Sequence, residues 1–397
     1  MTPTSQPALI VGAGPVGLGA ALFLTRRGLP VRIIEMRDAP SVQSRALAVN
    51  PRTLDILEPT GVTAEMLRLG LRVRGVRFQR RGRVIGRIDF DGIHPRYPFM
   101  LALSQATTER LLERALSAAG RSVERGVRLV NVRPVGDHVD AVVQRASDVA
   151  GAAAAAETIR APWMLAADGA HSVARRQLNV PFEGATFRRE WYLADVPLNT
   201  KLPEDLAHVF FITGGAFVFM IRVVDDQLKS AAPLWRVMTN RPHPVAVLSY
   251  AEGEAGVAER DRSVAAGVPV WESSFRIAHR LDATLSKDGV FFAGDAAHVH
   301  SPLGARGMNL GVEDVWVLSE LAAAGRLAEY DRLRRPVDHS VVRRVELLSK
   351  MASAESPLFG FVRRSVFPRA MELRTVRRFM LRTVTGLDHH LPAIARV

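Results

Sequence analysis

The segment Ala8–Gly28 constrains the fold of this chain more than any other part of its sequence. Four apolar residues, Ala8–Val11, predict a short strand that leads directly into the sequence Gly-Ala-Gly-Pro-Val-Gly. The apolar pattern then predicts a helix up to Gly28, which Pro15 can begin because a proline in the first helical turn leaves no hydrogen bond unmade. A glycine turn between a strand and a helix is typical of the first βαβ unit of a dinucleotide-binding domain.

Each glycine of this turn has a separate expected role. Gly12 permits the tight turn, Gly14 lets the backbone approach a pyrophosphate, and Gly17 lets the helix lie close to the strand. The start of the helix, at Pro15 and Val16, offers free N–H groups and the positive end of the helix dipole. We therefore expect these five residues to bind the diphosphate of a cofactor.

The second predicted strand, Val31–Ile34, ends in an acidic residue. A carboxylate about 20 residues past the glycine turn accepts hydrogen bonds from the hydroxyl groups of a ribose, and Glu35 has this position. Arg37 follows closely, and we include it among the cofactor-binding residues. The carboxylate would repel a 2′-phosphate, so the sequence favours FAD or NAD over NADP at this site.

Patterns further along the chain predict the domain organisation. Alternating strands and helices near both ends favour a parallel sheet with helices on both faces. Short β-rich runs separated by Gly and Pro indicate strands of an antiparallel sheet contributed from two places in the sequence. We expect a discontinuous nucleotide-binding domain at residues 1–74, 99–181 and 276–330, a β lobe at residues 75–98 and 182–275, and C-terminal helices at residues 331–397. Prolines 336, 357 and 368 are expected to divide that last region.

Two further motifs resemble one family of flavoproteins. Ala167–Arg175 is similar to the Asp-Gly motif of the class A flavoprotein aromatic hydroxylases, the para-hydroxybenzoate hydroxylase family. Phe292–Pro302 resembles the Gly-Asp motif of that family and continues into Gly304–Gly311 as the family does. The resemblance lies near the polyketide and phenol hydroxylase branch and extends from Ala8 to about residue 330, with a weaker match at residues 386–388. It implies a Rossmann-like FAD-binding domain of the glutathione-reductase type, with an inserted antiparallel β-sheet substrate lobe.

The resemblance also implies roles for individual residues. Asp295 would bind a ribitol hydroxyl of FAD, and the turn before the last helix would face the flavin N1–C2=O edge with backbone N–H groups. The implied cofactor contacts beyond the opening unit are Arg45, Gln105, Asp168, Gly294, Asp295, Gly304, Arg306, Gly307, Met308 and Asn309. Arg222 would face the flavin from the substrate lobe, unless it is a solvated strand arginine, and Pro302 would supply flavin-adjacent backbone.

The activity that the resemblance implies is that of an FAD-dependent monooxygenase. Such an enzyme uses NADPH or NADH and O2 to hydroxylate an aromatic or polyketide-like substrate through a flavin C4a-hydroperoxide. Two alternatives stay open: an FAD-dependent reductase or other flavin oxidoreductase of the same fold, and a non-catalytic FAD-fold protein associated with membrane. The basic and apolar stretch Phe361–Leu381 motivates the second alternative, although packing of this stretch against the FAD domain is the other use for it.

Composition limits the remaining functions. Lys and Arg exceed Asp and Glu by 53 to 40, but the positive charge is scattered and no basic-aromatic platform accompanies it, so we expect no nucleic-acid partner. The absence of cysteine excludes disulfides and thiolate metal sites. His298 and His300 form a His-x-His pair without an evident third ligand, so we expect no metal. We expect a cytoplasmic monomer or homodimer, because no apolar run reaches the roughly 20 residues of a membrane span and no signal peptide is evident.

Overall fold

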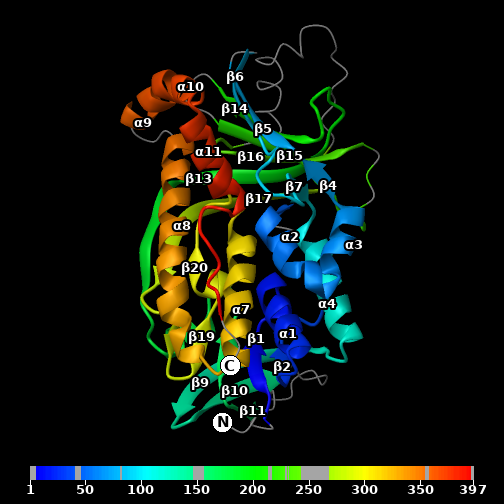
Figure 1. The fold of residues 1–397 in the computed structure, drawn as a ribbon, viewed down its shortest axis with the longest axis vertical. Coiled ribbons are helices and arrows are strands. Elements are labelled where there is room, and N and C mark those ends of the chain that lie inside the picture. Colours follow the sequence, from blue (N-terminus) through cyan, green and yellow to red (C-terminus); the bar gives the residue numbers. More distant parts are fainter. Residues whose placement is uncertain are drawn as a thin grey trace.

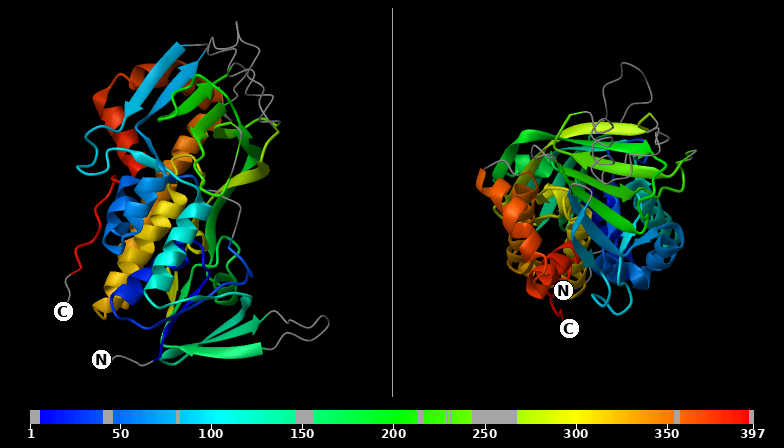
Figure 2. Two further views of the ribbon diagram at one scale, coloured as in Figure 1. Left: turned by 90° about the vertical axis from the view of Figure 1, so that its right-hand side faces the viewer. Right: turned by 90° about the horizontal axis from the view of Figure 1, so that it is seen from above.

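The chain folds into a nucleotide-binding unit and a β lobe that lies over it (Figures 1 and 2). A computed structural model describes residues 6–40, 46–80, 83–145, 156–212, 217–228, 230, 232–242, 268–353 and 357–394. Within these residues, no helix combines the length and the apolar composition that crossing a membrane requires.

The opening unit has the predicted order. Strand β1 (Ala8–Val11) leads into helix α1 (Pro15–Arg26), and β2 (Val31–Ile34) returns beside β1 in parallel register, with Val11 opposite Ile34. The helix ends at Arg26, and the N–H of the C-cap residue Arg27 donates to the carbonyl of Leu24. The prediction of a strand, a glycine turn, a helix and a second strand is therefore confirmed.

The three motifs meet because their strands are neighbours in one sheet. This six-stranded sheet has the order β18-β19-β12-β1-β2-β8. Strand β12 (Met164–Ala166) pairs in parallel with β1 on one side and with β19 (Val290–Phe292) on the other, which places Val11, Ala166 and Phe292 in one row. The edges are β8 (Val123–Glu124), parallel to β2, and β18 (Ser286–Lys287), antiparallel to β19.

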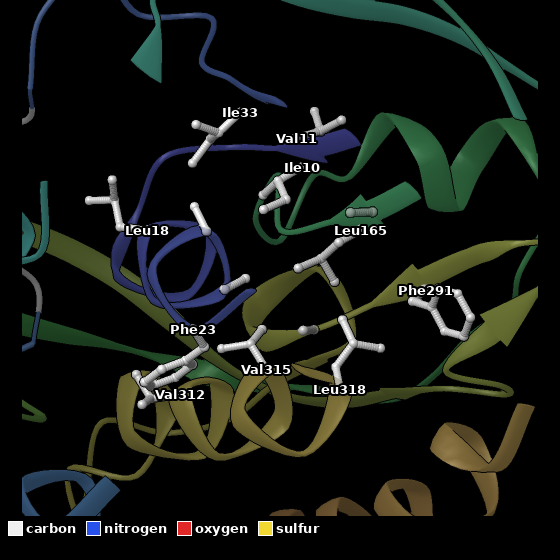
Figure 3. Close-up of a cluster of buried hydrophobic side chains, with 14 of the residues drawn as sticks. Ile10, Val11, Leu18, Phe23, Ile33, Leu165, Phe291, Val312, Val315 and Leu318 are labelled. Carbon is white, nitrogen blue, oxygen red and sulfur yellow. The ribbon is translucent and has the colours of Figure 1, made fainter. Parts of the chain in front are cut away.

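The core of this unit joins the sheet to two helices. Figure 3 shows Ile10 and Leu165 from the sheet facing Phe23 of α1 and Val315 of α7 (Gly307–Ala323). Helix α4 (Gln105–Ala118) packs beside α1, and its N-cap Ser104 accepts the N–H of Thr107 at 3.0 Å.

The expectation that helices cover both faces of the parallel sheet is wrong in one respect, because a small β-sheet also packs against its core. The core cluster also contains side chains of a small antiparallel sheet with the order β11-β10-β9, comprising β9 (Val127–Val135), β10 (His138–Arg145) and β11 (Ala156–Ala161). Alternating valines such as Val139 and Val143 bury one face of it. Most of the alanine-rich segment between β10 and β11 falls outside the described residues.

The β lobe is an eight-stranded sheet with the order β20-β17-β13-β16-β15-β14-β5-β6. It joins two distant segments of the chain, as predicted, because β5 pairs in parallel with β14. The other pairs are antiparallel. The strands are β5 (Gly75–Arg80), β6 (Arg83–Asp89), β13 (Phe182–Pro197), β14 (Leu206–Phe211), β15 (Phe217–Arg222), β16 (Leu234–Thr239), β17 (Trp271–Asp282) and β20 (His298–Val299). A third small sheet, β3-β7-β4, comprises Ala48–Val49, Met100–Ala102 and Leu71–Val73.

The remaining helices surround these sheets. In the first half of the chain they are α2 (Pro51–Leu57), the 3-10 turn η1 (Glu58–Thr60), α3 (Val62–Leu69) and α5 (Val173–Gln177). In the second half they are η3 (Gly294–Ala296), η4 (Leu327–Glu329), α8 (Tyr330–Ser353), α9 (Pro357–Phe361), η5 (Val362–Val366), α10 (Phe367–Ala370) and α11 (Arg374–Thr385).

Two expectations for the C-terminal region need correction. Pro336 does not divide the region, because α8 continues through it. The buried side chains of Tyr330, Arg334 and Val341 hold both parts of this helix against the core, which can offset the roughly 3 kcal/mol that an internal proline costs. The stretch Phe361–Leu381 does not pack against the FAD domain alone. The ring of Phe367 lies 5.3 Å from that of Phe78 in the β lobe, and the same core cluster contains Leu47 and Met100.

Candidate functional site

The candidate site lies where β1, β12 and β19 end side by side. Because these strands are parallel, the loops that follow them leave the sheet at the same edge, which is where α/β sheets bind ligands. The loop after β1 carries the glycine turn, the loop after β12 carries Asp168, and the loop after β19 carries Gly294 and Asp295.

The three glycines of the opening turn differ in their surroundings. Gly12 has φ +100°, and a Cβ there would lie 2.3 Å from the carbonyl oxygen of Ala167. A Cβ on Gly17 would lie 1.8 Å from the carbonyl oxygen of Gly12, so this glycine is needed for the close approach of helix and strand. A Cβ on Gly14 would meet no atom within 4 Å. The open space lies at the one glycine whose predicted role is to face a pyrophosphate.

The start of α1 is open to a ligand. Gly14 is its N-cap, and no side chain caps the helix. Unbonded N–H groups at a helix N-terminus, with the positive end of the dipole, attract phosphate.

Glu35 lies beside this helix start and organises the turn. Its Oε2 accepts the N–H of Ala13 at 2.8 Å, and its Oε1 accepts the N–H and Nε of Arg37 at 3.1 and 2.9 Å. Burial alone would raise the pKa of Glu35, but these hydrogen bonds outweigh burial and lower it. Arg37 therefore stabilises the carboxylate, and its contact with a cofactor stays a prediction.

Asp168 caps the short helix α5 at the same edge. Its Oδ2 accepts the N–H of Val173 at 2.7 Å, while its Oδ1 is buried and accepts no hydrogen bond from a described residue. Burial raises the pKa of Asp168, although its bonds to Ser172 and Val173 oppose that shift. One oxygen thus accepts a hydrogen bond from the start of α5, and the other can accept one from a ligand or water.

The Gly-Asp motif brings α7 against α1. A Cβ on Gly294 would lie 2.8 Å from Val16 Cγ2, and one on Gly311 would lie 2.5 Å from the same atom. Asp295 is exposed, whereas its neighbours Gly294 and Ala296 are buried. Asp295 therefore exposes its side chain at this edge between two buried neighbours.

The turn before α7 has an unusual backbone. Gly304 has φ +100° and Ala305 has φ +52°, which is rare for a residue with a Cβ and is found most often at functional sites. The N–H of Ala305 donates to the carbonyl of Pro302 at 3.0 Å and closes the turn. Helix α7 then begins at Gly307 without a side-chain cap.

The predicted residues of this turn do not all face the same way. Met308 and Asn309 are buried. Asn309 donates to the carbonyls of Ala48 and Ala305 at 2.9 and 2.6 Å and accepts the N–H of Asn50 at 3.0 Å. Its side chain fixes the turn, so a cofactor contact at Asn309 would be through the backbone. Arg306 is fully buried, and its guanidinium nitrogens donate no hydrogen bond to a described residue.

Two other predicted residues are placed differently. Gln105 accepts the N–H of Ala46 at 3.1 Å and donates to Glu109 at 2.9 Å, which positions it at the start of α4. Arg45 lies outside the described residues. The contacts predicted for both with the cofactor stay predictions.

The expected role of Arg222 finds no support in its position. Along β15, Phe217 and Ile221 face the cluster that contains Leu303 of the turn before α7, whereas Val218 and Met220 face a separate cluster. Arg222 shares the alternation of Val218 and Met220, and it bonds Glu204 at 3.0 Å and the carbonyl of Leu234 at 2.6 Å. Period-two alternation therefore directs it away from the turn.

The inner face of the β lobe covers the turn with apolar side chains. Leu303 and Ala305 belong to one cluster with Trp191, Met238 and Phe275 of the sheet. The same face carries a buried ion pair, in which Arg236 donates to Asp195 at 2.7 Å through two nitrogens. An aromatic ring held beside the turn would thus meet aromatic and apolar neighbours.

Buried charges behind the turn were not predicted from the sequence. His298 Nε2 lies 2.7 Å from Asp314 Oδ2, and Arg334 donates to Asp314 and Asp338 at 2.8 and 3.0 Å. Burial alone would lower the pKa of His298, but Asp314 raises it to about 9. The pattern Glu313-Asp314 was visible in the sequence, but its partners lie on α8 and could be found only from the fold.

The same group has the spacing of a metal site. His298, Asp314 and Asp338 have ligand atoms within 4.8 Å of one another. Because Arg334 donates to both carboxylates, its guanidinium already supplies the positive charge that would attract a cation. His300, the other histidine of the pair in the sequence, does not belong to this group, and the expectation of no metal stays a prediction.

A surface cavity lies away from the motif edge. It has a volume of about 540 Å³ and opens between β17 and α8, where His279, His339 and Glu346 line it. Its lining contains none of the predicted site residues, so we place the site by the motifs rather than by this cavity.

The residues at the motif edge fit an FAD molecule. The open space at Gly14 and the uncapped start of α1 suit a diphosphate, and Glu35 lies where a ribose would follow. Asp295 is exposed for a ribitol hydroxyl, and the uncapped start of α7 offers N–H groups to a flavin carbonyl.

Comparisons with known proteins agree with this fit. The sequence model described as FAD binding domain matches residues 5–345. The chain is 34% identical over 359 residues to 6-methylpretetramide 4-monooxygenase of Streptomyces rimosus, which covers 89% of this chain and 59% of that protein. It is 29% identical to pentachlorophenol 4-monooxygenase of Sphingobium chlorophenolicum, covering 78% of this chain and 56% of that protein. The chain thus spans less than two thirds of both relatives.

A solved structure shows the same fold over nearly its whole length. The p-nitrophenol 4-monooxygenase of Pseudomonas putida DLL-E4 superposes with a TM-score of 0.80 at 21% identity, covering 96% of this chain and 98% of that one.

Proposed function

Since this chain belongs to the FAD binding domain family, we propose that it is a monooxygenase that uses NADPH or NADH and O2 to hydroxylate an aromatic or polyketide-like substrate. The names of two relatives support this reaction class, because both are monooxygenases, one named for 6-methylpretetramide and one for pentachlorophenol.

One observation carries the proposal. The apolar inner face of the β lobe shares a cluster with Leu303 and Ala305, in the turn that precedes α7. An aromatic substrate between the lobe and the turn would therefore lie next to the part of the site that suits the flavin. A pocket lined by aromatic and apolar side chains with few polar groups is typical of small-molecule sites.

The residues of this chain have supporting roles in such a reaction. FAD supplies the redox and oxygen chemistry when it is bound. The start of α1 and Gly14 would hold the diphosphate, Glu35 would bind the ribose, and Asp295 would orient the ribitol. The N–H groups at the start of α7 would stabilise negative charge at the flavin edge, since preorganised donors and a helix N-terminus act without reorganisation.

The β lobe excludes water and holds the substrate. Trp191, Met238 and Phe275 provide apolar contacts, and the Asp195–Arg236 pair supplies polar atoms on the same face. Exclusion of water protects a reactive oxygen species from decay to hydrogen peroxide.

Oxidation of NADPH and NADH with a panel of phenols tests the proposal. The purified protein loaded with FAD should oxidise one of these nucleotides faster when a suitable phenol is present, and a hydroxylated product should form. Oxidation that no aromatic compound stimulates, with no hydroxylated product, would contradict the monooxygenase and favour a reductase of the same fold.

We further propose that the protein acts in the cytoplasm on a small aromatic substrate, as a monomer or homodimer. The need for a supply of reduced pyridine nucleotide supports this location.

A further inference from the structure

A group of buried charges adjoins the turn that precedes α7, and we call it the Arg306 node. It consists of Arg306, Glu313, Asp388 and His389. Arg306 has no exposed surface, and its ion-pair partner is Asp388, with NH2 3.3 Å from Asp388 Oδ1. None of the guanidinium nitrogens donates a hydrogen bond of good geometry within the described part of the chain. The guanidinium is therefore paired with Asp388, but its N–H groups make no hydrogen bond of good geometry with the described residues.

Asp388 is fixed by other residues. Arg344 NH1 donates to its Oδ2 at 2.6 Å, and the His389 ring lies 3.0 Å from its Oδ1. The other ring nitrogen of His389 lies 2.6 Å from Glu313 Oε2 on α7. His389 thus bridges the C-terminal segment and the helix that begins at the turn.

The backbone of this segment is also held. Arg52 donates to the carbonyls of Gly386 and His389 at 3.2 and 2.6 Å. A Cβ on Gly386 would lie 2.8 Å from Arg306 NH1, so the segment lies directly against the guanidinium. The segment follows residue 345, where the match to the FAD binding domain family ends.

The charge states in the node follow from these contacts. Burial alone would raise the pKa of Asp388, but His389, Arg306 and Arg344 hold it far below its usual range. Burial alone would likewise raise the pKa of Glu313, but His389 and Arg306 lower it. The neighbours of Asp388 therefore stabilise its negative charge, and this carboxylate lies beside the Arg306 guanidinium.

We propose that Asp388 is a positioning residue of the flavin site, which holds the Arg306 guanidinium at the turn and offsets the positive charge that Arg306 presents to the flavin. This inference rests on the proposed placement of the flavin at the turn. A cation at that edge favours the reduced, negatively charged flavin, and a carboxylate beside the cation opposes this effect. A segment outside the family domain thus sets the electrostatic potential at the cofactor.

The test measures the flavin itself rather than turnover. The midpoint potential of the bound FAD and the dissociation constant of its sulfite adduct are measured for the wild type and for Asp388→Asn. Removal of the carboxylate should shift the reduction equilibrium about tenfold toward reduced flavin, which is about 30 mV upward for a two-electron couple. Sulfite, which adds negative charge to the flavin, should bind about tenfold more tightly at an effective dielectric constant of about 20.

Three further variants make the result specific. Arg306→Gln should shift both quantities in the opposite direction, and the double variant Arg306→Gln/Asp388→Asn should return close to the wild type because both charges are gone. Asp140→Asn removes the same charge from β10, where Asp140 bonds Arg160 at 3.2 Å, and should change neither quantity. His389→Gln removes the imidazole that faces Asp388 and should lower the potential.

An unchanged potential and sulfite affinity in Asp388→Asn, with FAD bound, would overturn the inference. If that variant does not fold, an unchanged potential in His389→Gln would overturn it instead. Neither measurement needs a substrate, so a protein that shows these shifts but hydroxylates no phenol would contradict the proposed function alone.

Discussion

Gly14 and Gly17 are three positions apart in the opening turn, yet the space around them differs. The space at Gly14 is open, whereas at Gly17 the carbonyl of Gly12 lies within bonding distance of an added carbon. We expect Gly14→Val to fold with an unfolding free energy within about 0.5 kcal/mol of the wild type, since its Cβ meets no protein atom. Its affinity for FAD should fall by at least about tenfold, or about 1.4 kcal/mol.

Gly17→Ala should show the reverse pattern. An overpacked core site costs about 1–3 kcal/mol or more, so the FAD-free protein itself should be less stable. Urea denaturation of both apoproteins and FAD titration by fluorescence quenching measure the two effects. Equal loss of stability in both variants would contradict the assignment of the open space to the cofactor.

Asp282 gives a prediction for pH. Its carboxyl has no exposed surface and accepts no hydrogen bond from a described residue, and Arg175 Nε lies 3.8 Å away. Burial raises the pKa of Asp282 to about 8, although Arg175 opposes the shift. In the unfolded chain its pKa is about 3.9.

A raised pKa in the folded state contributes stability that is fully present below about pH 4 and is lost as the pH rises through about 8. The nearly isosteric Asp282→Asn removes this dependence. Its unfolding free energy relative to the wild type should therefore increase between pH 5 and pH 8, as measured by urea denaturation at several pH values. A difference that is constant over this range would show that Asp282 is ionised in the folded protein.

The roles of the opening glycines were predictable because they depend on residues close in sequence. The packing roles of Gly12 and Gly17 are confirmed by their contacts. The partners of Asp314 and Arg306 were not predictable, because Arg334 and Asp388 reach them from distant helices and segments. Nor could the sequence show that Arg222 points outward, since this depends on the register of the β lobe.

At the scale of elements, the C-terminal segment is held by a close backbone contact. Gly386 has φ +79°, and a Cβ there would lie 2.4 Å from Asn50 Nδ2 and 2.8 Å from Arg306 NH1. We expect Gly386→Ala to detach the segment from α7 and α2. Limited proteolysis should then cut after residue 385 faster than in the wild type, and the FAD-free protein should be less stable.

Gly120→Ala is the matched control for that variant. Gly120 has φ +77°, but a Cβ there would meet no atom within 4 Å. It therefore reports the cost of the left-handed backbone alone, which is about 1 kcal/mol. If both variants lose the same stability and resist proteolysis equally, the contact with Arg306 and Asn50 does not hold the segment.

Element boundaries were predictable where local chemistry sets them. Ser104 and Asn50 cap α4 and α2, since each accepts an N–H from three residues further on. Pro336 does not mark the end of a helix, because the packing of α8 outweighs the tendency of proline to end one. The packing of Phe367 against Phe78 joins segments almost 300 residues apart, and local pattern alone did not reveal it.

At the scale of the whole molecule, the three motifs and the family resemblance that they carry predicted most of the architecture. Strands β1, β12 and β19 carry the three motifs and are adjacent in the sheet, so their loops converge although they are far apart in the sequence. The short β-rich runs in two parts of the sequence predicted that two segments form the β lobe. The layer formed by β9–β11 was not predicted, because the alternation of strands and helices predicts helices there.

The central claim is that the chain binds FAD at this edge and transfers one atom of O2 to an aromatic substrate. The most direct measurement is mass spectrometry of the product formed under isotopically labelled O2, with FAD-loaded protein, NADPH or NADH, and a phenol that stimulates nucleotide oxidation. We expect a hydroxylated product that carries one labelled oxygen atom. Nucleotide oxidation that yields only hydrogen peroxide with every stimulating phenol, or a product whose oxygen comes from water, would contradict it.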